Sequence, residues 1–520
     1  MSNAPKVIAR MRLTGLIHSG AVTALAVGFL ALLVGAGPQP RPTGGEAADP
    51  AQSERVLTPD NPHNHGILNA LLKRLFGNPK CEKLSHTGSE VWTVPHSKLA
   101  RLEQRLLSLG IKFALLREDW NHILRPNKAP MSNEQKEALA RAKEAPAAVS
   151  AGVMRVPEAA VAEYALTATP EQGNSRIIVP VGDQQIGLVR TSARVTDKGV
   201  IWRGTVEDTG ETAILQWWKD GRLNGLFGYR GHIYSVMSMG GDLHAMLEFN
   251  PKMMPADHPK VAAEVPHGDA PGSPRGEPAV PPPLPNVEPI SRERLAELES
   301  KPIVIDVMML YTKRAVSHYM MKPEDVLELS FERVNDTFRN SGIPNVSVRL
   351  VHSQAVDYDE QGSEEFVDLY RMVDGDGPFK DVRRLRNEKH ADIVGLLVDD
   401  PSGCGLSTRV APDAEEAYFV VHYSCAAITV SIAHEIGHIL GARHDRGTDP
   451  TNTPFPYGHG YVDGSKWRDI MSYAESCEGC LRIPYWSNPR ILYKGEPTGT
   501  LTEDNARVIL EQAERVSKFR

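Results

Sequence analysis

The chain has 520 residues, of which 41% are hydrophobic and 24% are charged. A chain of this length is too long for one ordinary domain, so we expect two or three. The formal net charge at pH 7 is −7, and no segment forms a basic stripe or a basic domain. Composition therefore argues against nucleic acid as a partner.

The N-terminus has the pattern of a secretory signal peptide. Lys6, Arg10 and Arg12 precede an apolar run over residues 20–37, which prolines and small residues follow. A basic start, an apolar middle and a small-residue end are the parts of an export signal. The run is close to the minimum length that spans a bilayer. We therefore expect residues 1–40 to be a signal peptide or an N-terminal anchor and the protein to be secreted; retention in the periplasm or at the membrane stays open.

The next region, residues 41–263, is expected to contain a β-rich domain. Between residues 176 and 249, short runs rich in Val, Ile, Thr and Trp alternate with Gly-containing turns. This alternation predicts an antiparallel meander with strands over 177–181, 201–206, 212–218, 226–229 and 232–237. Many prolines follow, so residues 264–299 are expected to be a semi-rigid linker.

Residues 300–520 are expected to form a separate α+β domain. Buried strands are predicted over 303–311, 346–351, 393–398 and 417–422. Helices are predicted over 323–340, 366–373, 379–389, 425–440 and 502–519, the last one capped by Thr502. Strands that alternate with helices in this way predict a mixed, twisted sheet.

The strongest functional signal lies at the end of the helix predicted over 425–440. His434 and His438 are four residues apart, so a helix places them one turn apart on one face, where both can bind one metal ion. Glu435 lies beside the first of them and can reach a water on that metal. Gly441 allows the chain to end the helix with φ > 0 and turn back, which can bring His444 to the same ion. Three protein ligands and an open fourth position are typical of a catalytic zinc.

Four of the five cysteines lie in the last quarter of the chain and fit an exported protein. Four cysteines allow three pairings, and we favour Cys404–Cys425 with Cys477–Cys480. Cys477 and Cys480 also form a Cys-x-x-Cys motif, which occurs in redox pairs and in halves of zinc ribbons. Because only one such motif is present, without a thioredoxin-like context, structural disulfide bonds are the preferred interpretation.

The motif over residues 434–444, followed by Met471, resembles that of the metzincin zinc proteases. In that family a methionine turn follows the third histidine, and residues 469–473 match it. Asp445 after the third histidine resembles the adamalysins, whereas Tyr473, two residues beyond the methionine, resembles the serralysins and astacins. With residues 305–307 and 483–489, the combination is most similar to the bacterial reprolysin-like group, which includes the peptidyl-Asp metalloendopeptidases.

The resemblance implies a metzincin catalytic domain, with its active-site helix and Met-turn, preceded by a β-rich propeptide domain. It implies zinc endopeptidase activity on protein or peptide substrates, with one Zn²⁺ held by the three histidines and Glu435 as general base. Tyr473 would bind the resting zinc and then hydrogen-bond the developing oxyanion. Met471 would form an apolar floor beneath the imidazoles, and Asp445 would fix the loop that carries His444.

Less directly, the resemblance implies cleavage on the amino side of acidic residues. Such a preference needs a cation in the pocket on the primed side. The arginines near the motifs are the candidates: Arg443, Arg446, Arg468 and Arg482. For each arginine by itself, a surface position or a structural salt bridge is the preferred interpretation from sequence.

An exported protease has to be kept inactive, and the region before the catalytic domain is well placed to be an inhibitory propeptide. Cys81, the odd cysteine, could occupy the fourth zinc position as a cysteine switch. Residues 78–82 do not reproduce the usual switch motif, so a free or mispaired structural cysteine is the preferred interpretation.

Two other functional classes remain open from the sequence. One is a catalytically silent binding or adhesion protein on a metzincin scaffold, and the other is a zinc hydrolase that acts on a non-peptide bond. We expect a monomer. Ca²⁺ is a conceivable further ligand, because acidic residues cluster at 374–376 and 399–400, but solvated loops explain both clusters.

Overall fold

The structure is a computed structural model of the whole chain and describes residues 123–126, 130–167, 176–259, 284–360 and 364–520, with five short strands nearer the N-terminus. No helix in these ranges is long and apolar enough to cross a membrane. The apolar run of the expected signal or anchor, residues 20–37, lies outside them. The chain forms two compact units. The first comprises Met1–Arg125, Arg155–Trp202 and Trp217–Arg222, and the second comprises Pro126–Met154, Arg203–Gln216 and Leu223–Arg520.

The first unit is rich in β-structure. Five N-terminal strands pair in the order β3-β4-β2-β1-β5: β1 (Ile8–Met11), β2 (Ser53–Leu57), β3 (Lys80–Lys83), β4 (Glu90–Pro95) and β5 (Phe113–Ala114). Helix α5 (Glu158–Thr167) precedes an antiparallel hairpin of β8 (Arg176–Val181) and β9 (Gln184–Val195). Cys81 falls in β3, but its side chain lies outside the described part of the chain, so the cysteine switch is not tested.

Most of the antiparallel meander expected from the sequence lies in the second unit, whereas its first expected strand, residues 177–181, corresponds to β8 of the first unit. Strands β12 (Leu223–Tyr229), β13 (His232–Ser238) and β14 (Leu243–Phe249) pair in sequence. Arg230 and Gly231, both with positive φ, form the tight turn between β12 and β13, as in two-residue hairpins. The strands predicted at 201–206 and 212–218 correspond to β10 (Gly199–Val206) and β11 (Thr212–Trp218), whereas β7 (Ala148–Arg155), β9 and β14 were missed.

A five-stranded mixed sheet organises the rest of the second unit, as the sequence predicted. Its order is β16-β15-β17-β19-β18, and only β18 runs antiparallel to its neighbour. The strands are β15 (Ile303–Thr312), β16 (Val346–Val356), β17 (Ile393–Val398), β18 (Gly405–Ser407) and β19 (Tyr418–His422). Every residue of β17 and β19 is buried, which is typical of strands covered on both faces.

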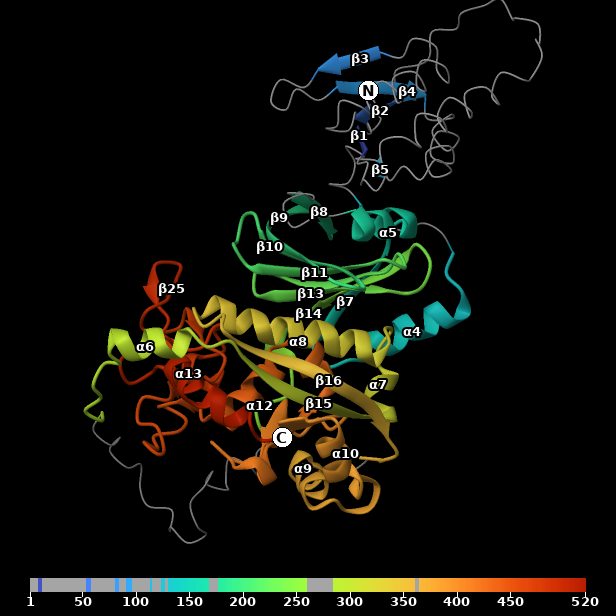
Figure 1. Cartoon of the computed structure of the whole chain (residues 1–520). Helices are drawn as coiled ribbons and strands as arrows, with labels where there is room; N and C mark the ends of the chain where they lie inside the picture. Colours follow the sequence, from blue (N-terminus) through green and yellow to red (C-terminus); the bar gives the residue numbers. More distant parts are fainter. Residues whose placement is uncertain are drawn as a thin grey trace, which may run out of the picture. The chain divides into compact units, whose positions relative to one another are not determined.

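Helices cover both faces of this sheet (Figure 1). On one face, Ile305, Val307 and Met309 of β15 pack with α8 (Pro323–Asn340), α12 (Ser431–Leu440) and α13 (Asn505–Val516). On the other, Met308 and Leu310 pack with α9 (Glu365–Asp374) and α10 (Val382–Glu388). Because successive side chains of a strand point to opposite faces, β15 contributes residues to two hydrophobic cores, one on each face of the sheet.

Two helix predictions and the linker prediction need correction. The helix expected over 425–440 is two helices, α11 (Tyr423–Ile428) and α12, because Thr429 is extended and its hydroxyl bonds the carbonyl of Cys425 and accepts from the amide of Ser431. The last helix is capped by Asp504, which accepts from the amide of Arg507, and not by Thr502. Part of the expected linker is helix α6 (Arg292–Glu299), which Ser291 caps.

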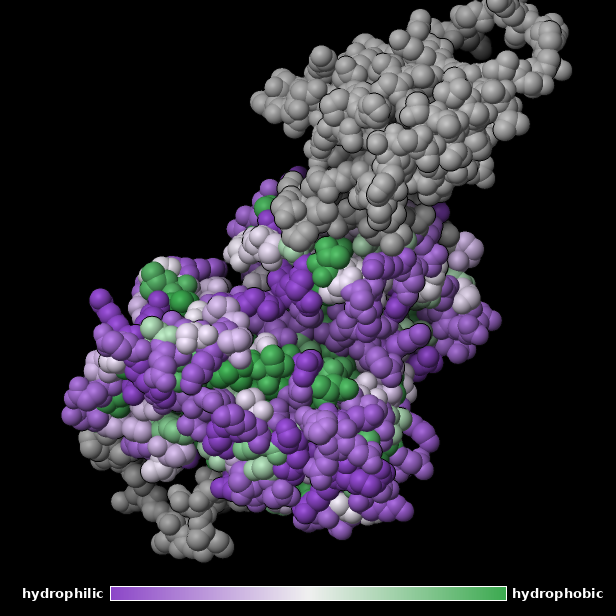
Figure 2. Space-filling view, in the orientation of Figure 1, coloured by the Kyte–Doolittle hydropathy of each residue, from purple (hydrophilic) through white to green (hydrophobic). Residues whose placement is uncertain are grey.

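The remaining described elements of the second unit are short: β6 (Arg125–Pro126, at the unit boundary), α4 (Asn133–Lys143), η4 (Pro251–Met253), α7 (Lys313–Ser317), η5 (Gly377–Phe379), η6 (Ala414–Glu416), β20 (Arg443–Asp445), β21 (His459–Gly460), β22 (Val462–Asp463), β23 (Trp467–Arg468), η7 (Glu475–Cys477), β24 (Leu481–Arg482), β25 (Leu492–Tyr493) and β26 (Glu496–Pro497). The predicted disulfide bonds, Cys404–Cys425 and Cys477–Cys480, are both confirmed. Figure 2 shows a mainly hydrophilic face with a strip of apolar residues across its middle and smaller separate apolar patches, in keeping with large apolar side chains that are mostly inside.

Candidate active site

Helix α12 and the strand after it bring the three predicted histidines together. His434 and His438 lie one turn apart, with ring centroids 4.9 Å from each other. Gly441 ends the helix at φ 105°, and β20 then returns His444 to 4.6 Å from His438 and 5.2 Å from His434. A side chain at Gly441 would be strained in this conformation and would also meet Phe455 at 2.6 Å.

The ring orientations suit a shared metal ion. His434 Nδ1 lies 2.8 Å from the carbonyl oxygen of Ile470, and His438 Nδ1 lies 3.0 Å from that of Ala442. A carbonyl oxygen only accepts, so each Nδ1 carries the proton and each Nε2 keeps a lone pair for a metal. Burial, and then the neighbouring His438, lowers the pKa of His434 and favours the neutral, metal-binding form. The donor set fits Zn²⁺.

A fourth histidine, which sequence reasoning missed, lies at the same point. His258 Nε2 is 2.9 Å from His434 Nε2 and 3.3 Å from His444 Nε2. The four histidines are buried and offer nitrogens that lie within 4.8 Å of one another, the one such group of possible metal ligands in the described ranges. His258 precedes the catalytic motif by more than 170 residues and has no motif of its own, so no local signal could have identified it.

Glu435 follows the first histidine and is almost fully buried, with 1% of its surface exposed. Its Oε1 is 4.0 Å from Nε2 of His258, so the carboxylate borders the histidine group. Burial raises the pKa of Glu435 well above its ordinary value, while the charge of Arg482 acts in the opposite direction. Gly405 of β18 makes room for this carboxylate, because a Cβ there would lie 2.7 Å from Oε1.

Residues 469–473, which resemble a Met-turn, lie beside the histidines and α12. Met471 is fully buried, and its sulfur would be 2.9 Å from a Cβ at Gly437 of α12, so only glycine fits between them. The ring of Tyr473 is 4.3 Å from that of His444. Burial raises the pKa of Tyr473 well above its ordinary value, so its hydroxyl keeps the proton and can donate it in a hydrogen bond.

Asp445 joins the loop of the third histidine to the Met-turn. Its Oδ2 accepts from the backbone amide of Tyr473 at 3.1 Å, and its Oδ1 accepts from the hydroxyl of Ser476 at 2.7 Å. The same carboxylate also accepts from the amide of Gly447 and from the amide and hydroxyl of Thr448. These contacts agree with the positioning task expected of Asp445.

The four candidate arginines fall into two pairs. Arg443 contacts Asp449 at 2.7 Å and Arg446 contacts Glu503 at 3.0 Å, so both stabilise loops. Arg468 of β23 and Arg482 of β24 are register partners in a parallel pair, which places them side by side.

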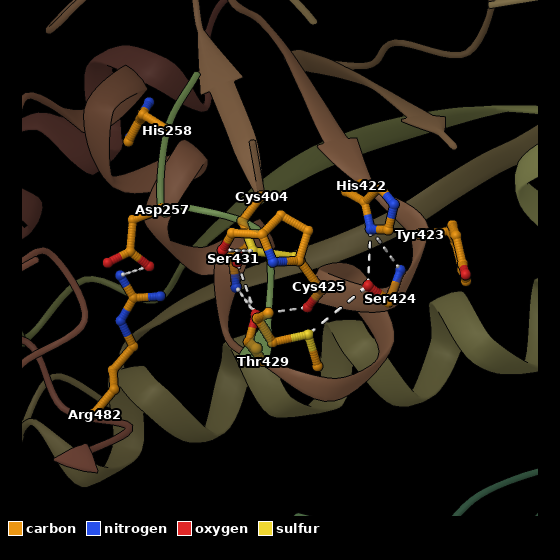
Figure 3. Close-up of a disulfide and its surroundings, with 12 residues drawn as sticks. Asp257, His258, Cys404, His422, Tyr423, Ser424, Cys425, Thr429, Ser431 and Arg482 are labelled. Atoms are coloured by element: carbon orange, nitrogen blue, oxygen red, sulfur yellow. Dashed lines mark hydrogen bonds and ion pairs between the residues drawn. A yellow bond between two sulfur atoms is a disulfide. The ribbon is translucent and has the colours of Figure 1, made fainter. Parts of the chain in front are cut away.

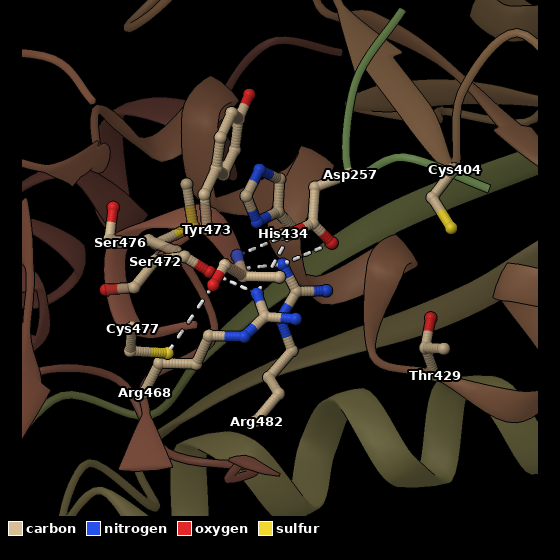
Figure 4. A network of polar contacts seen from close by, with 12 residues as sticks. Asp257, Cys404, Thr429, His434, Arg468, Ser472, Tyr473, Ser476, Cys477 and Arg482 are labelled. Atoms are coloured by element: carbon tan, nitrogen blue, oxygen red, sulfur yellow. Dashed lines mark hydrogen bonds and ion pairs between the residues drawn. The ribbon is translucent and has the colours of Figure 1, made fainter. Parts of the chain in front are cut away.

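Arg468 and Arg482 both face one carboxylate, that of Asp257 (Figure 4). The distances are 2.9 Å from Arg468 Nη1 to Oδ2 and 3.0 Å from Arg482 Nη2 to Oδ1, and about a tenth of each side chain is exposed. Burial by itself would raise the pKa of Asp257, but the charges of Arg482 and Arg468 outweigh it and hold that pKa below its ordinary value.

The segment that carries Asp257 and His258 runs past the Cys404–Cys425 disulfide bond (Figure 3). The amide of Cys404 donates to the carbonyl oxygen of Ala256 at 2.7 Å, next to the start of the edge strand β18. Close packing continues at Gly403, where a Cβ would lie 2.6 Å from the ring of Pro259.

The acidic loops considered for Ca²⁺ form no grouped ligand site in the described ranges. Asp399 instead contacts Arg314 at 2.8 Å and His318 at 3.1 Å. The carboxylate of Asp399 therefore has side-chain partners within the protein.

The chain is similar in sequence to a family of metallopeptidases and to several of its relatives. The model of metallo-peptidase family M12 (Reprolysin_5) matches residues 301–487. A peptidyl-Asp metalloendopeptidase of Xanthomonas campestris pv. campestris is 32% identical over 302 residues, which cover 57% of this chain and 67% of that protein. One from Stenotrophomonas maltophilia (strain R551-3) is 30% identical over 363 residues, 65% of this chain and 81% of that protein. The solved metalloproteinase-II from Bacteroides fragilis is 13% identical and covers 66% of this chain and 92% of its own, but its TM-score of 0.33 carries no weight.

Proposed function

This chain belongs to the M12 metallopeptidases and is a zinc metalloendopeptidase, and from that premise we propose that it is an exported, latent precursor that cuts on the amino side of acidic residues. His434, His438 and His444 converge on one point beside the buried Glu435, and this arrangement supports the proposed roles in catalysis. Nothing in that arrangement favours a catalytically silent scaffold, because the ligands and the general base are all present.

The chemistry needs a metal and a base at one place. When bound, zinc lowers the pKa of a coordinated water to about 7 and polarises the scissile carbonyl. Glu435 takes the proton of the attacking water and then passes it to the leaving amine, which departs as a neutral group. The α12 backbone holds Glu435 and the two helical histidines in one rigid frame, so the carboxylate needs no reorganisation during the reaction.

Tyr473 is the second residue that we propose acts on the substrate. Its ring lies against His444, and its hydroxyl keeps its proton at neutral pH. We assign to that hydroxyl a hydrogen bond to the carbonyl oxygen that gains negative charge during attack. Replacement by Phe should lower kcat more than it raises KM, because the bond strengthens only in the transition state.

The preference for acidic residues is supported by the pair of arginines beside the metal site. Arg468 and Arg482 lie next to each other and are nearly buried, which is unfavourable for two cations unless an anion lies between them. A substrate carboxylate would meet both guanidinium groups in charge-assisted hydrogen bonds. The relatives named above are peptidyl-Asp metalloendopeptidases, which agrees with this specificity.

Export and latency rest on separate support. The basic and apolar N-terminal pattern and two disulfide bonds fit a protein that matures in an oxidising compartment. The chain before residue 300 would then act as an intramolecular inhibitor, and the enzyme would work as a monomer on protein or peptide substrates.

One digest tests the proposal. A mixed peptide library is treated with the processed enzyme and, in parallel, with its Glu435→Ala twin, and all new termini are identified by mass spectrometry. Cuts made only by the wild type, with Asp or Glu directly after the cut bond, are expected. Random flanking residues would remove the specificity, and an absence of cuts by folded, zinc-loaded protein would remove the proposed activity.

A further inference from the structure

His258 lies in one group with the three histidines that are the predicted zinc ligands. Four nitrogens that surround one ion tetrahedrally at about 2.05 Å lie about 3.3 Å apart. The Nε2 atom of His258 is 3.3 Å from that of His444 and 2.9 Å from that of His434, which is close to this spacing. The side chain is buried, with 6% of the residue exposed. The four ligand nitrogens all lie within 4.8 Å of one another, so one ion in this group could take His258 as a fourth imidazole ligand in place of water.

Asp257, the residue before His258, occupies the pocket of the paired arginines. Its carboxylate accepts from Arg468 at 2.9 Å and from the amide of Ala474 at 3.3 Å, and it forms an ion pair with Arg482 at 3.0 Å. Three partners on one carboxylate, two of them charged and nearly buried, form a built anion site rather than a surface contact. His258 thus occupies the metal site and Asp257 occupies the arginine pocket, the two parts of the site that a substrate would need.

The backbone around this dipeptide is fixed to the edge of the catalytic sheet. The bond from the amide of Cys404 to the carbonyl oxygen of Ala256 holds it on one side, and Pro259 packs against Gly403 on the other. The disulfide bond to Cys425 stiffens this edge. An extended segment that pairs with an exposed strand edge is a common way to bind a peptide in a groove.

We propose that Asp257 and His258 form an autoinhibitory latch: His258 is the fourth ligand of the catalytic zinc, and Asp257 takes the place of the acidic side chain of a substrate. This proposal rests on the proposed function, because it uses both the zinc site and the acidic pocket. It assigns to His258, which no sequence motif identified, the zinc-blocking role that a cysteine switch would give to Cys81; the structure does not test Cys81.

The order of Asp257 and His258 explains why the latch can occupy the active site without being cut as a substrate. In a substrate cut on the amino side of an acidic residue, the carbonyl that meets the metal belongs to the residue before the acidic one. In the latch, the group at the metal belongs to His258, the residue after Asp257. The segment therefore lies in the site in the opposite direction to a substrate, and an imidazole instead of a peptide carbonyl faces Glu435.

The decisive experiment counts the ligands of the metal in the unprocessed, full-length chain. All samples carry Glu435→Ala to prevent self-cleavage, and His258→Ala is compared with its parent and with Lys252→Ala, an exposed neighbour in the same segment. X-ray absorption of the zinc-loaded protein should give four imidazole ligands in the parent and in Lys252→Ala, and three in His258→Ala. Three imidazoles in the parent would overturn the proposal.

Access of a small anion to the metal gives an independent readout. In the cobalt-substituted proteins, azide should change the visible absorption of His258→Ala but not that of the parent, because only the variant has an open position. Asp257→Asn keeps the size of the side chain and should give azide partial access, which keeps the test informative if His258→Ala fails to fold. Equal azide binding by the parent and the Asp257→Asn variant would contradict the latch.

Activity separates this proposal from the function on which it rests. A latch that is closed in about 99% of molecules weakens apparent substrate binding about 100-fold, so unprocessed His258→Ala with Glu435 intact should cut a fluorogenic peptide up to about 100-fold faster than the wild-type precursor. If azide and X-ray absorption show the opened site but no peptide is ever cut, the latch stands and the protease function fails. If processed wild type cuts peptides but the precursor has three imidazoles, the function stands and the latch fails.

Discussion

Replacing Arg482 by Gln should remove most of the selectivity for acidic residues and leave the metal site intact. The guanidinium makes one close contact to the carboxylate of Asp257, at 3.0 Å, while Arg468 makes the other at 2.9 Å. A hydrogen bond to a charged group contributes about 1.5–3 kcal/mol, so the loss of one of the two contacts corresponds to roughly a 10- to 150-fold change in kcat/KM. Arg468 and the amide of Ala474 would retain part of the preference.

The assay uses two fluorogenic peptides that differ only by Asp or Asn after the cut bond, with the processed enzyme. Arg482→Gln should lower kcat/KM for the Asp peptide by that factor and change the Asn peptide little. Lys466→Gln is the matched control, because Lys466 lies two residues before Arg468 but its side chain is 64% exposed and contacts Asp463. An unchanged Asp-to-Asn ratio in Arg482→Gln, or an equal loss for both peptides, would refute the assignment of the pocket.

Three further predictions concern the support of the site and the fold. Asp445→Ala removes the acceptor that joins the loop of His444 to the segment of Tyr473 and Ser476. Zinc should therefore bind roughly 10- to 100-fold more weakly, as measured by competition with a chelator. An unchanged zinc affinity would contradict the positioning role of Asp445. Gly405→Ala should place a Cβ 2.7 Å from Oε1 of Glu435 and displace that carboxylate. Because general base catalysis contributes about 100-fold or more to the rate, kcat should fall by about that factor while the zinc content stays unchanged. Full activity would show that the carboxylate does not act from this position. Burial lowers the pKa of His244 from 6.5 to about 4. Above pH 6.5, His244 is neutral in both the folded and the unfolded chain, so it does not change the stability. As the pH falls towards 4, the unfolded chain binds a proton at His244 and the folded chain does not. The free energy of unfolding should therefore decrease by about 3 kcal/mol in total. Urea titrations between pH 7 and pH 4 measure this slope, and His244→Gln should reduce it; an equal slope in the variant would contradict the prediction.

Much of the fold followed from local patterns in the sequence. The apolar run at 393–398 predicted β17, and the helical spacing at 323–340 predicted α8, both with the bounds that the structure has. The paired cysteines were also identified correctly. Such features depend on residues close together in the chain, whose periodicity and spacing are visible without a structure.

Errors arose where a local hydrogen bond competes with a continuing pattern. The apolar stripe of residues 425–440 is compatible with one helix, but the hydroxyl of Thr429 bonds to the backbone and divides it. At the last helix, Thr502 and Asp504 both have capping side chains, and only the contact of Asp504 with the amide of Arg507 shows which one is used. Sequence patterns locate such helices but leave their ends uncertain by several residues.

The sequence by itself determined that three of the histidines and a carboxylate come together, because His434, Glu435, His438 and His444 lie within eleven residues and one helix with its turn fixes their relative positions. Only the tertiary structure decided what stands opposite them. Asp257 and His258 reach the site from a segment that precedes the motif by more than 170 residues, and Arg468 and Arg482 become neighbours through the register of two short parallel strands. Contacts of this kind depend on how distant segments pack, and no spacing along the chain records that.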